Sequence, residues 1–169
     1  MRIPPVVPGT RPELAQLEAG ILAERGGISL VYSTLLNSPA MAHGWEQLLS
    51  AVRNRNSLPA DLREMVILRV AVLNRAMFEF DAHVPHALKA GMSAEKIEAM
   101  RGGAEADFTA VERAVLALTD AMTREIDVSD ALYQSTSAHF SQQQMLDLVV
   151  TIGAYNMVSR FLIALQVGH

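Results

Sequence analysis

The chain has 169 residues, of which 50% are hydrophobic and 19% are charged, and its formal net charge is -4. This length fits one domain that buries a sizeable core, and the hydrophobic content excludes an intrinsically disordered protein. The mild negative charge, with no basic patch, argues against a nucleic-acid partner. The sequence contains no cysteine, which excludes disulfides, cysteine-type zinc sites and thiolate nucleophiles.

Two stretches bear on where the protein is expected to work. Residues 1–6 contain no apolar run long enough for a signal peptide, so we expect a cytoplasmic protein. Residues 146–165 are apolar enough to resemble a membrane span, but Asp147, Asn156 and Arg160 interrupt them. Because such residues are costly in hydrocarbon, we expect the buried helix of a soluble bundle or oligomer, without a membrane partner.

The N-terminal part of the chain predicts an arm followed by helices. Residues 1–9 hold three of the seven prolines and are expected to be extended, whereas residues 10–169 are expected to form a single all-helical domain. The first helix is predicted to start at Thr10, which forms a capping-box pattern with Glu13. Gly26 and Gly27 are expected to end it, and Ser38-Pro39 to start the next helix.

The middle of the chain predicts a helix that is buried on nearly all sides. It begins after Leu58-Pro59 and runs to about Asn74, and only Arg69 is polar within residues 65–73. A further helix is expected from about Met77 to Ala90.

Helix-start signals continue to the end of the chain. Ser93 is expected to cap a short helix that ends near Gly102-Gly103, and Ser129 another. Capping boxes are predicted before two longer helices, of which the second is apolar and runs to about Gln166: Thr109 with Glu112, and Ser141 with Gln144. No strand pattern is present, so the predicted fold class is an all-α bundle.

Glu64, Glu79 and His83 are the candidate catalytic residues. Glu79 and His83 are four residues apart and share one helix face, while Glu64 lies on the preceding, mostly apolar helix. A carboxylate and an imidazole near an apolar wall suit general acid–base catalysis, because burial and charge tune their pKa values toward neutral pH. A Glu–His pair is also common as a purely structural feature, but a buried Glu64 must be paired, neutralised or used.

Several segments together resemble one known family, the carboxymuconolactone decarboxylase-like family, which includes the alkylhydroperoxidase D-like proteins. The resemblance covers roughly residues 58 to 167 and is carried by Leu62-Arg63-Glu64-Met65, Phe78-Glu79-Phe80-Asp81-Ala82-His83, Ala87, Gly91, Ser93, Ile97 and residues 153–161. It implies an all-α bundle that forms a closed homo-oligomer with pockets near the subunit boundaries. Dimer, trimer and hexamer all remain open.

The peroxidase members of this family carry a glutamate, a C-x-x-C pair, and a histidine four residues after the second cysteine. Glu64 matches the glutamate and His83 the histidine, whereas the two cysteine positions fall on Ala76 and Glu79. A peroxidase cycle of this kind needs a thiolate nucleophile and a resolving thiol. We therefore expect that the protein is not a thiol peroxidase.

Two carboxylates and an imidazole remain, and they predict proton-transfer chemistry. The leading hypothesis is a cofactor-free acid–base enzyme, a decarboxylase, other lyase or isomerase, acting on a small carboxylated or carbonyl compound such as a lactone. Glu79 would shuttle the proton, His83 would orient or protonate it, and Glu64 would hold the tautomer of His83.

Arg160, His86 and Tyr155 are the candidate substrate-binding residues. Arg160 is expected to be buried in the apolar C-terminal helix, where it would bind a substrate carboxylate or form a structural salt bridge with Glu64 or Glu79. His86 extends the Glu79–His83 stripe by one turn, and Tyr155 can add a hydrogen bond.

Two alternatives stay open at this point. Glu79, His83 and His86 could face one metal ion, with Glu64 as a fourth ligand, although the His-Glu-x-x-His spacing of helical zinc sites is absent. The chain could also be a non-catalytic helical oligomer that keeps the family's pocket for a small ligand, as the loss of both cysteines suggests.

Overall fold

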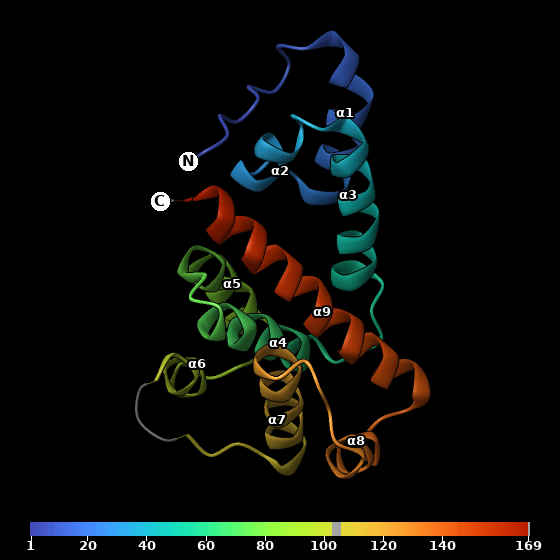
Figure 1. Cartoon of the computed structure of the whole chain (residues 1–169), viewed down its shortest axis with the longest axis vertical. Helices are drawn as coiled ribbons and strands as arrows, with labels where there is room; N and C mark the ends of the chain where they lie inside the picture. The colour runs from blue at the N-terminus through green and yellow to red at the C-terminus, as the bar shows by residue number, and fades with distance from the viewer. Residues whose placement is uncertain (103–105, 169) are drawn as a thin grey trace. The chain divides into compact units, whose positions relative to one another are not determined.

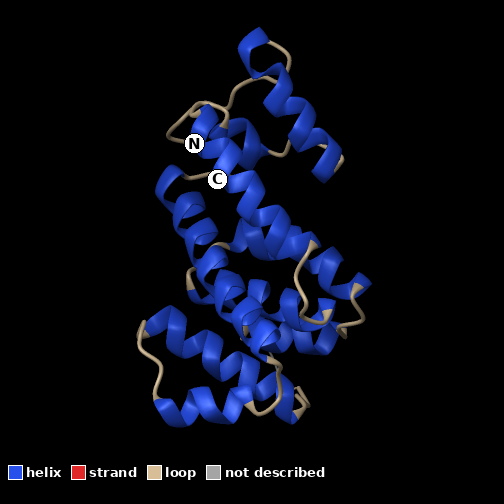
Figure 2. Cartoon of the chain, turned by 90° about the vertical axis from the view of Figure 1, so that its right-hand side faces the viewer, coloured by secondary structure: helices blue, strands red, loops and turns tan. Residues whose placement is uncertain are grey.

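The computed structural model describes residues 1–102 and 106–168, and every regular element in those ranges is a helix (Figure 2). The predicted all-α fold class is therefore confirmed. The roles expected of Gly103 as a helix end and of His169 as the end of the domain lie outside the described residues. The elements are η1 Pro12–Leu14, α1 Ala15–Arg25, α2 Leu30–Leu35, α3 Pro39–Asn54, α4 Ala60–Leu73, α5 Met77–Lys89, α6 Ala94–Arg101, α7 Ala110–Arg124, α8 Asp130–Ser137 and α9 Gln142–Leu165 (Figure 1).

The chain forms two compact units, which we describe separately. The first unit consists of residues 1–55 and 162–169, and the second of residues 56–161. All three candidate catalytic residues belong to the second unit. The sequence-based division into an arm and one helical domain stays a prediction.

The N-terminal arm packs against its own unit. Val6 is only 4% exposed, and its N–H donates to the carbonyl of Ser33 at 2.8 Å. The N–H of Gly9 donates to the carboxylate of Glu18 at 2.9 Å. Residues 1–9 therefore have no regular secondary structure, but their backbone polar groups find partners within the unit.

The start of the first helix differs from the prediction. The hydroxyl of Thr10 donates to the carbonyl of Val7 at 2.6 Å, so the Thr10–Glu13 capping box is wrong. The chain instead enters the 3₁₀ turn η1, in which Pro12 removes one backbone donor, before α1 begins at Ala15. Gly26 ends α1 as predicted, with a φ of 71° that disfavours other residues.

The short helix α2 was not predicted. Its residues, Leu30–Leu35, span too few positions to show a helical period, and Ser29 makes no side-chain capping bond to mark its start. By contrast, α3 begins at Pro39 directly after Ser38, as the sequence indicates.

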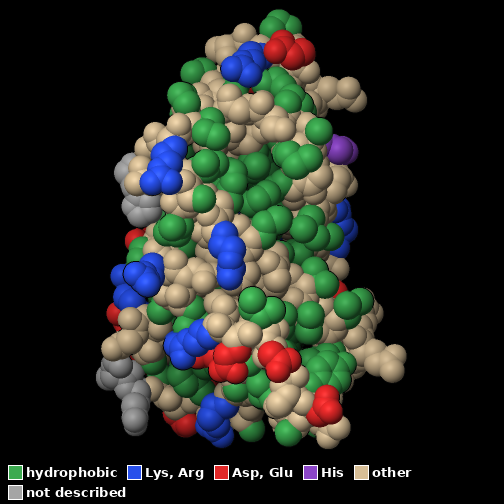
Figure 3. Space-filling model, in the orientation of Figure 1, with side chains coloured by type: hydrophobic (Ala, Val, Ile, Leu, Met, Phe, Trp, Pro, Cys, Tyr) green, Lys and Arg blue, Asp and Glu red, His purple; other side chains and the backbone are tan. Residues whose placement is uncertain are grey.

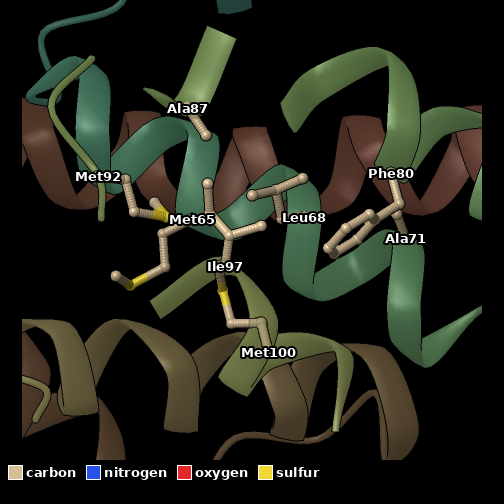
Figure 4. Close-up of a cluster of buried hydrophobic side chains, with 8 residues drawn as sticks. All are labelled: Met65, Leu68, Ala71, Phe80, Ala87, Met92, Ile97 and Met100. Carbon is tan, nitrogen blue, oxygen red and sulfur yellow. The ribbon is translucent and has the colours of Figure 1, made fainter. Parts of the chain in front are cut away.

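The second unit is built around α4, which is buried on most sides as predicted. Eight of its residues are buried, including Glu64. Figure 4 shows its side chains packed against those of α5, α6 and the turn between them. This cluster holds Met65, Leu68, Ala71, Phe80, Ala87, Met92, Ile97 and Met100. The tight packing fixes the position of α5 on α4, and with it the side chains that both helices carry.

The predicted caps of the second unit are confirmed. The Thr109 hydroxyl accepts from the Glu112 N–H at 3.2 Å, and the Glu112 carboxylate accepts from the Thr109 N–H at 2.7 Å. Ser141 and Gln144 exchange the same pair of bonds at the start of α9. Ser93 and Ser129 cap α6 and α8. These helix starts are thus set by local sequence.

Helix α9 is long and apolar enough, by length and composition alone, to cross a membrane. Its most apolar 18-residue window has a mean hydropathy of 1.7, and 44% of that window is buried within the chain. A core helix of a soluble protein passes the same test. Hydrophobic side chains gather on the face of the molecule that α9 crosses in this view (Figure 3). Leu146, Val150 and Met157 are among the exposed residues of α9.

Candidate functional site

Glu64, His83 and Glu79 meet in the second unit, as the sequence predicts. Oε2 of Glu64 lies 2.6 Å from Nδ1 of His83, and Oε1 of Glu79 lies 3.3 Å from Nε2 of the same ring. Each of the two ring nitrogens of His83 therefore faces its own carboxylate.

Two adjacent helices position this cluster. Glu64 comes from α4, while Glu79 and His83 lie one turn apart on α5. The side chains of Glu64 and His83 are 4% and 5% exposed, and that of Glu79 is 11% exposed. Glu79 is thus the member that reaches nearest to solvent, as a group that meets a substrate must.

The protonation state of His83 follows from these surroundings. Burial lowers the pKa of the His83 imidazole, but the hydrogen bonds and charges of Glu64 and Glu79 outweigh burial and raise that pKa above its ordinary value of 6.5. The raised pKa favours the doubly protonated ring, in which Nδ1–H donates to Glu64 and Nε2–H faces Glu79.

Two of the candidate substrate-binding residues adjoin the imidazole. The ring of Tyr155, from α9, lies edge-on to His83 with the ring centres 5.4 Å apart, and Tyr155 is only 2% exposed. His86, one turn along α5, has its ring centre 5.4 Å from that of His83 and is exposed. Tyr155 thus forms a wall of the cluster, and His86 lies on its solvent side.

Arg160 differs from the sequence-based expectation. It is exposed rather than buried, and its Nη1 donates to the backbone carbonyl and to the side-chain Oδ1 of Asn156 at 3.0 and 2.5 Å. Among the described residues it forms no salt bridge with Glu64 or Glu79, so that expectation is wrong. Asn156, rather than Arg160, makes the partly buried hydrogen bonds of this part of α9. Its side chain accepts from Asn74 at 3.0 Å and donates to Thr123 at 2.9 Å. A substrate-binding role for Arg160 stays a prediction.

Arg63 is a residue of this region that the sequence reasoning missed. Its Nε lies 3.9 Å from Oε1 of Glu64, and its side chain is 16% exposed. The signal in the sequence was its position directly before Glu64. Adjacent helix residues point in different directions, however, so spacing alone does not place both beside one site.

The described residues contain no group of three His, Cys, Asp or Glu side chains arranged to hold a metal ion. The geometry of the cluster is instead a chain of three groups, carboxylate, imidazole and carboxylate, joined through the two ring nitrogens. Such a chain can hold and pass on a proton.

Two comparisons by sequence identify the relatives of this chain. Residues 39–121 match the carboxymuconolactone decarboxylase family. An uncharacterised protein of Bacillus subtilis strain 168, YdfG, is 31% identical over 114 residues, which are 66% of this chain and 78% of that protein. The chain belongs to the carboxymuconolactone decarboxylase family.

Solved structures share the fold. A protein of unknown function from Agrobacterium tumefaciens, provisionally assigned to antioxidant defence as an AhpD protein, has a TM-score of 0.73 and 27% identity over 80% of this chain and 94% of its own. The alkylhydroperoxidase AhpD core of Ralstonia eutropha JMP134 has a TM-score of 0.83 and 16% identity over 98% and 90%. The debrominase Bmp8, as the C82A variant with 2,3,4-tribromopyrrole, has a TM-score of 0.81 and 16% identity over 99% and 90%.

This member of the carboxymuconolactone decarboxylase family has lost the thiols of its peroxidase relatives. Ala76, which the resemblance matches to the first cysteine, is 1% exposed and precedes the start of α5. Glu79, which the resemblance matches to the second, faces His83. The side chain that meets the imidazole is therefore a carboxylate, which exchanges protons but does not undergo thiol redox chemistry.

Proposed function

We propose that this protein is a cofactor-free acid–base enzyme acting on a small carboxylated or carbonyl compound, such as a lactone. One observation supports this most directly: the His83 imidazole lies between two carboxylates, with the more accessible one, Glu79, at its Nε2. We further propose that it works as a soluble, cytoplasmic homo-oligomer.

Each member of the cluster has a distinct role in this proposal. Glu79 exchanges the proton with the substrate. His83, whose raised pKa favours the charged ring, holds a proton on Nε2 and passes it to Glu79. Glu64 accepts the Nδ1–H bond, which fixes the orientation of the ring and stabilises its charged form.

A decarboxylation illustrates the balance of the proposed step. The bond between the carboxylate and its α-carbon breaks, carbon dioxide leaves, and the electron pair delocalises into an adjacent carbonyl group. Nε2–H of His83 passes its proton to Glu79, and Glu79 delivers that proton to the carbon. Water then restores the proton of His83, and the hydroxide that remains combines with carbon dioxide as bicarbonate. Proton removal and return at one substrate carbon would give an isomerase from the same groups.

A turnover assay tests the proposal. The protein is incubated with small carboxylated lactones and β-keto acids while carbon dioxide release and ultraviolet absorbance are followed. We expect turnover by the wild type and a loss of about 10²-fold or more in Glu79→Gln. Asp130→Asn, an exposed carboxylate on α8, is the matched control. Equal rates in Glu79→Gln and the wild type would reject the assignment of Glu79.

A second candidate is a ligand-binding protein without catalysis. It is supported by the deep burial of Glu64 and His83 and by Tyr155, which covers one side of the ring. Glu79→Leu separates the candidates by its effect on the free energy of unfolding. A structural pair loses stability in this variant, whereas a catalytic site that stores unfavourable charge gains stability.

A further inference from the structure

Arg63 presents a buried donor without a hydrogen-bond partner. Its Nε is buried and has no such partner within the part of the chain that the structure describes. The nearest carboxylate oxygen, Oε1 of Glu64, is 3.9 Å away, which is too far for a hydrogen bond. A buried N–H donor without a hydrogen bond is costly, because it loses solvation without gaining a bond in return.

Two other partly buried arginines show what a structural role looks like in this fold. Arg69, also on α4, donates from Nε and Nη2 to the two carboxylate oxygens of Asp120 at 2.6 and 2.5 Å. In the first unit, Arg25 donates to Glu46 at 3.1 Å and to Ser50 at 3.2 Å. Among the described residues no such arrangement holds Arg63, although it lies less than two turns before Arg69 on the same helix.

We propose that Arg63 binds the carboxylate group of the substrate and thereby selects small organic anions. This inference rests on the proposed function, because it assigns a binding residue to the same cluster. The guanidinium lies beside Glu64, and 16% of the Arg63 side chain is exposed. Its planar fork of donors matches a carboxylate with two parallel hydrogen bonds.

The charges of the cluster support an anionic ligand. Two carboxylates alone would repel a substrate carboxylate. The guanidinium of Arg63 and the imidazole of His83, both beside Glu64, contribute positive charge that offsets this repulsion. Arg160, the arginine that the sequence favoured for this task, is exposed and bonded to Asn156.

A binding measurement tests Arg63 without depending on turnover. Levulinate, succinate and benzoate are titrated by calorimetry into the wild-type protein, Arg63→Gln, Arg63→Lys and the control Arg124→Gln, which changes an exposed arginine of α7. The methyl esters of the three acids report binding without the charge. Circular dichroism and sedimentation equilibrium establish that each variant is folded and has the wild-type oligomeric mass.

We expect at least one of the three anions to bind the wild type and Arg124→Gln equally, and to bind Arg63→Gln about tenfold or more weakly. Arg63→Lys should recover part of that loss, and the methyl esters should not distinguish the variants. Equal binding to Arg63→Gln would overturn the inference, as would the absence of anion binding by the wild type. A changed oligomeric mass in Arg63→Gln would also overturn it, because Arg63 would then pair across a subunit contact.

The two proposals can fail separately. Anion binding through Arg63 without turnover, and without an effect of Glu79→Gln, would leave the binding site in place and reject the enzyme. Turnover that depends on Glu79 but has the same KM in Arg63→Gln would support the enzyme and reject the role of Arg63.

Discussion

Glu64 contacts the His83 ring at Nδ1, with its Oε2 2.6 Å away, and so governs the charge of an imidazole that is itself buried. We predict that Glu64→Gln lowers the pKa of His83, because the variant removes a negative charge and a charged hydrogen bond while burial remains. The pKa is measured by following the ring protons of His83 by NMR across a pH titration. The same variant should lose about 1–3 kcal/mol of unfolding free energy. An unchanged His83 titration would contradict the assigned role of Glu64.

The raised pKa of His83 predicts a pH dependence of stability. Because the folded pKa is above the ordinary value of 6.5, protonation of His83 stabilises the fold fully below about pH 6.5, and this contribution is lost as pH rises through the folded pKa. The unfolding free energy of the wild type should therefore exceed that of His83→Gln most at low pH within the range where both fold. Urea titrations between pH 6 and pH 9 measure the difference.

The matched control for this experiment is His43→Gln, which changes an exposed histidine of α3. A stability difference between the wild type and His83→Gln that grows with rising pH would contradict the sign derived from the two carboxylates.

Asn156 is predicted to matter for stability rather than for chemistry. Its side chain bonds Asn74 and Thr123 and accepts from Arg160, so Asn156→Ala leaves partly buried partners unsatisfied. We expect a loss of about 1–3 kcal/mol in urea unfolding. Arg160→Gln, at an exposed position, should change the unfolding free energy by no more than about 0.5 kcal/mol. The reverse order of the two effects would contradict the structure.

Two of the predicted capping boxes begin with threonine, so the same substitution, threonine to alanine, tests whether each box forms. Thr109 caps α7 with both reciprocal bonds, whereas the Thr10 hydroxyl bonds the carbonyl of Val7. Thr109→Ala should cost about 1 kcal/mol of unfolding free energy, and Thr10→Ala should cost about half of that or less. Thermal or urea unfolding of both variants measures this. Equal losses of unfolding free energy in the two variants would mean that Thr10 caps the first helix, in contradiction to the structure.

The homo-oligomer expected from the sequence stays a prediction, and α9 is where to test it. Leu146, Val150 and Met157 expose apolar surface along this helix. If a second copy of the chain covers them, Val150→Glu should lower the mass found by sedimentation equilibrium, because a buried carboxylate without a partner is costly. Tyr133→Glu, at an exposed residue of α8, is the control. An unchanged mass in Val150→Glu would show that this part of α9 does not lie in the contact between subunits.

Features that depend on a few neighbouring residues could be predicted from the sequence. The capping bonds of Thr109 and Ser141 involve residues three positions apart, and Glu79 and His83 share a face because they are four apart. The pairing of Glu64 with His83 could not be predicted from spacing alone. The apolar character of α4 indicated that Glu64 is buried and needs a partner, and the family resemblance indicated that His83 belongs to the same site.

Features that depend on packing between distant segments could not be predicted in this way. Arg160 lies in an apolar stretch, but its position on α9 turns it to solvent, where Asn156 bonds it. The side chain of Arg63 approaches Glu64 although adjacent helix residues normally diverge. The arm likewise meets Ser33 through backbone bonds, which carry no side-chain signal.

The division of the chain into two compact units has a practical consequence for spectroscopy. The single tryptophan, Trp45, lies on α3 in the first unit, whereas His83 and the edge-on ring of Tyr155 lie in the second. Tryptophan fluorescence and the His83 proton resonances therefore report the melting of different units within one sample. Coincident transitions would show that the units unfold as one cooperative body, and separate midpoints would show that each unit unfolds independently of the other.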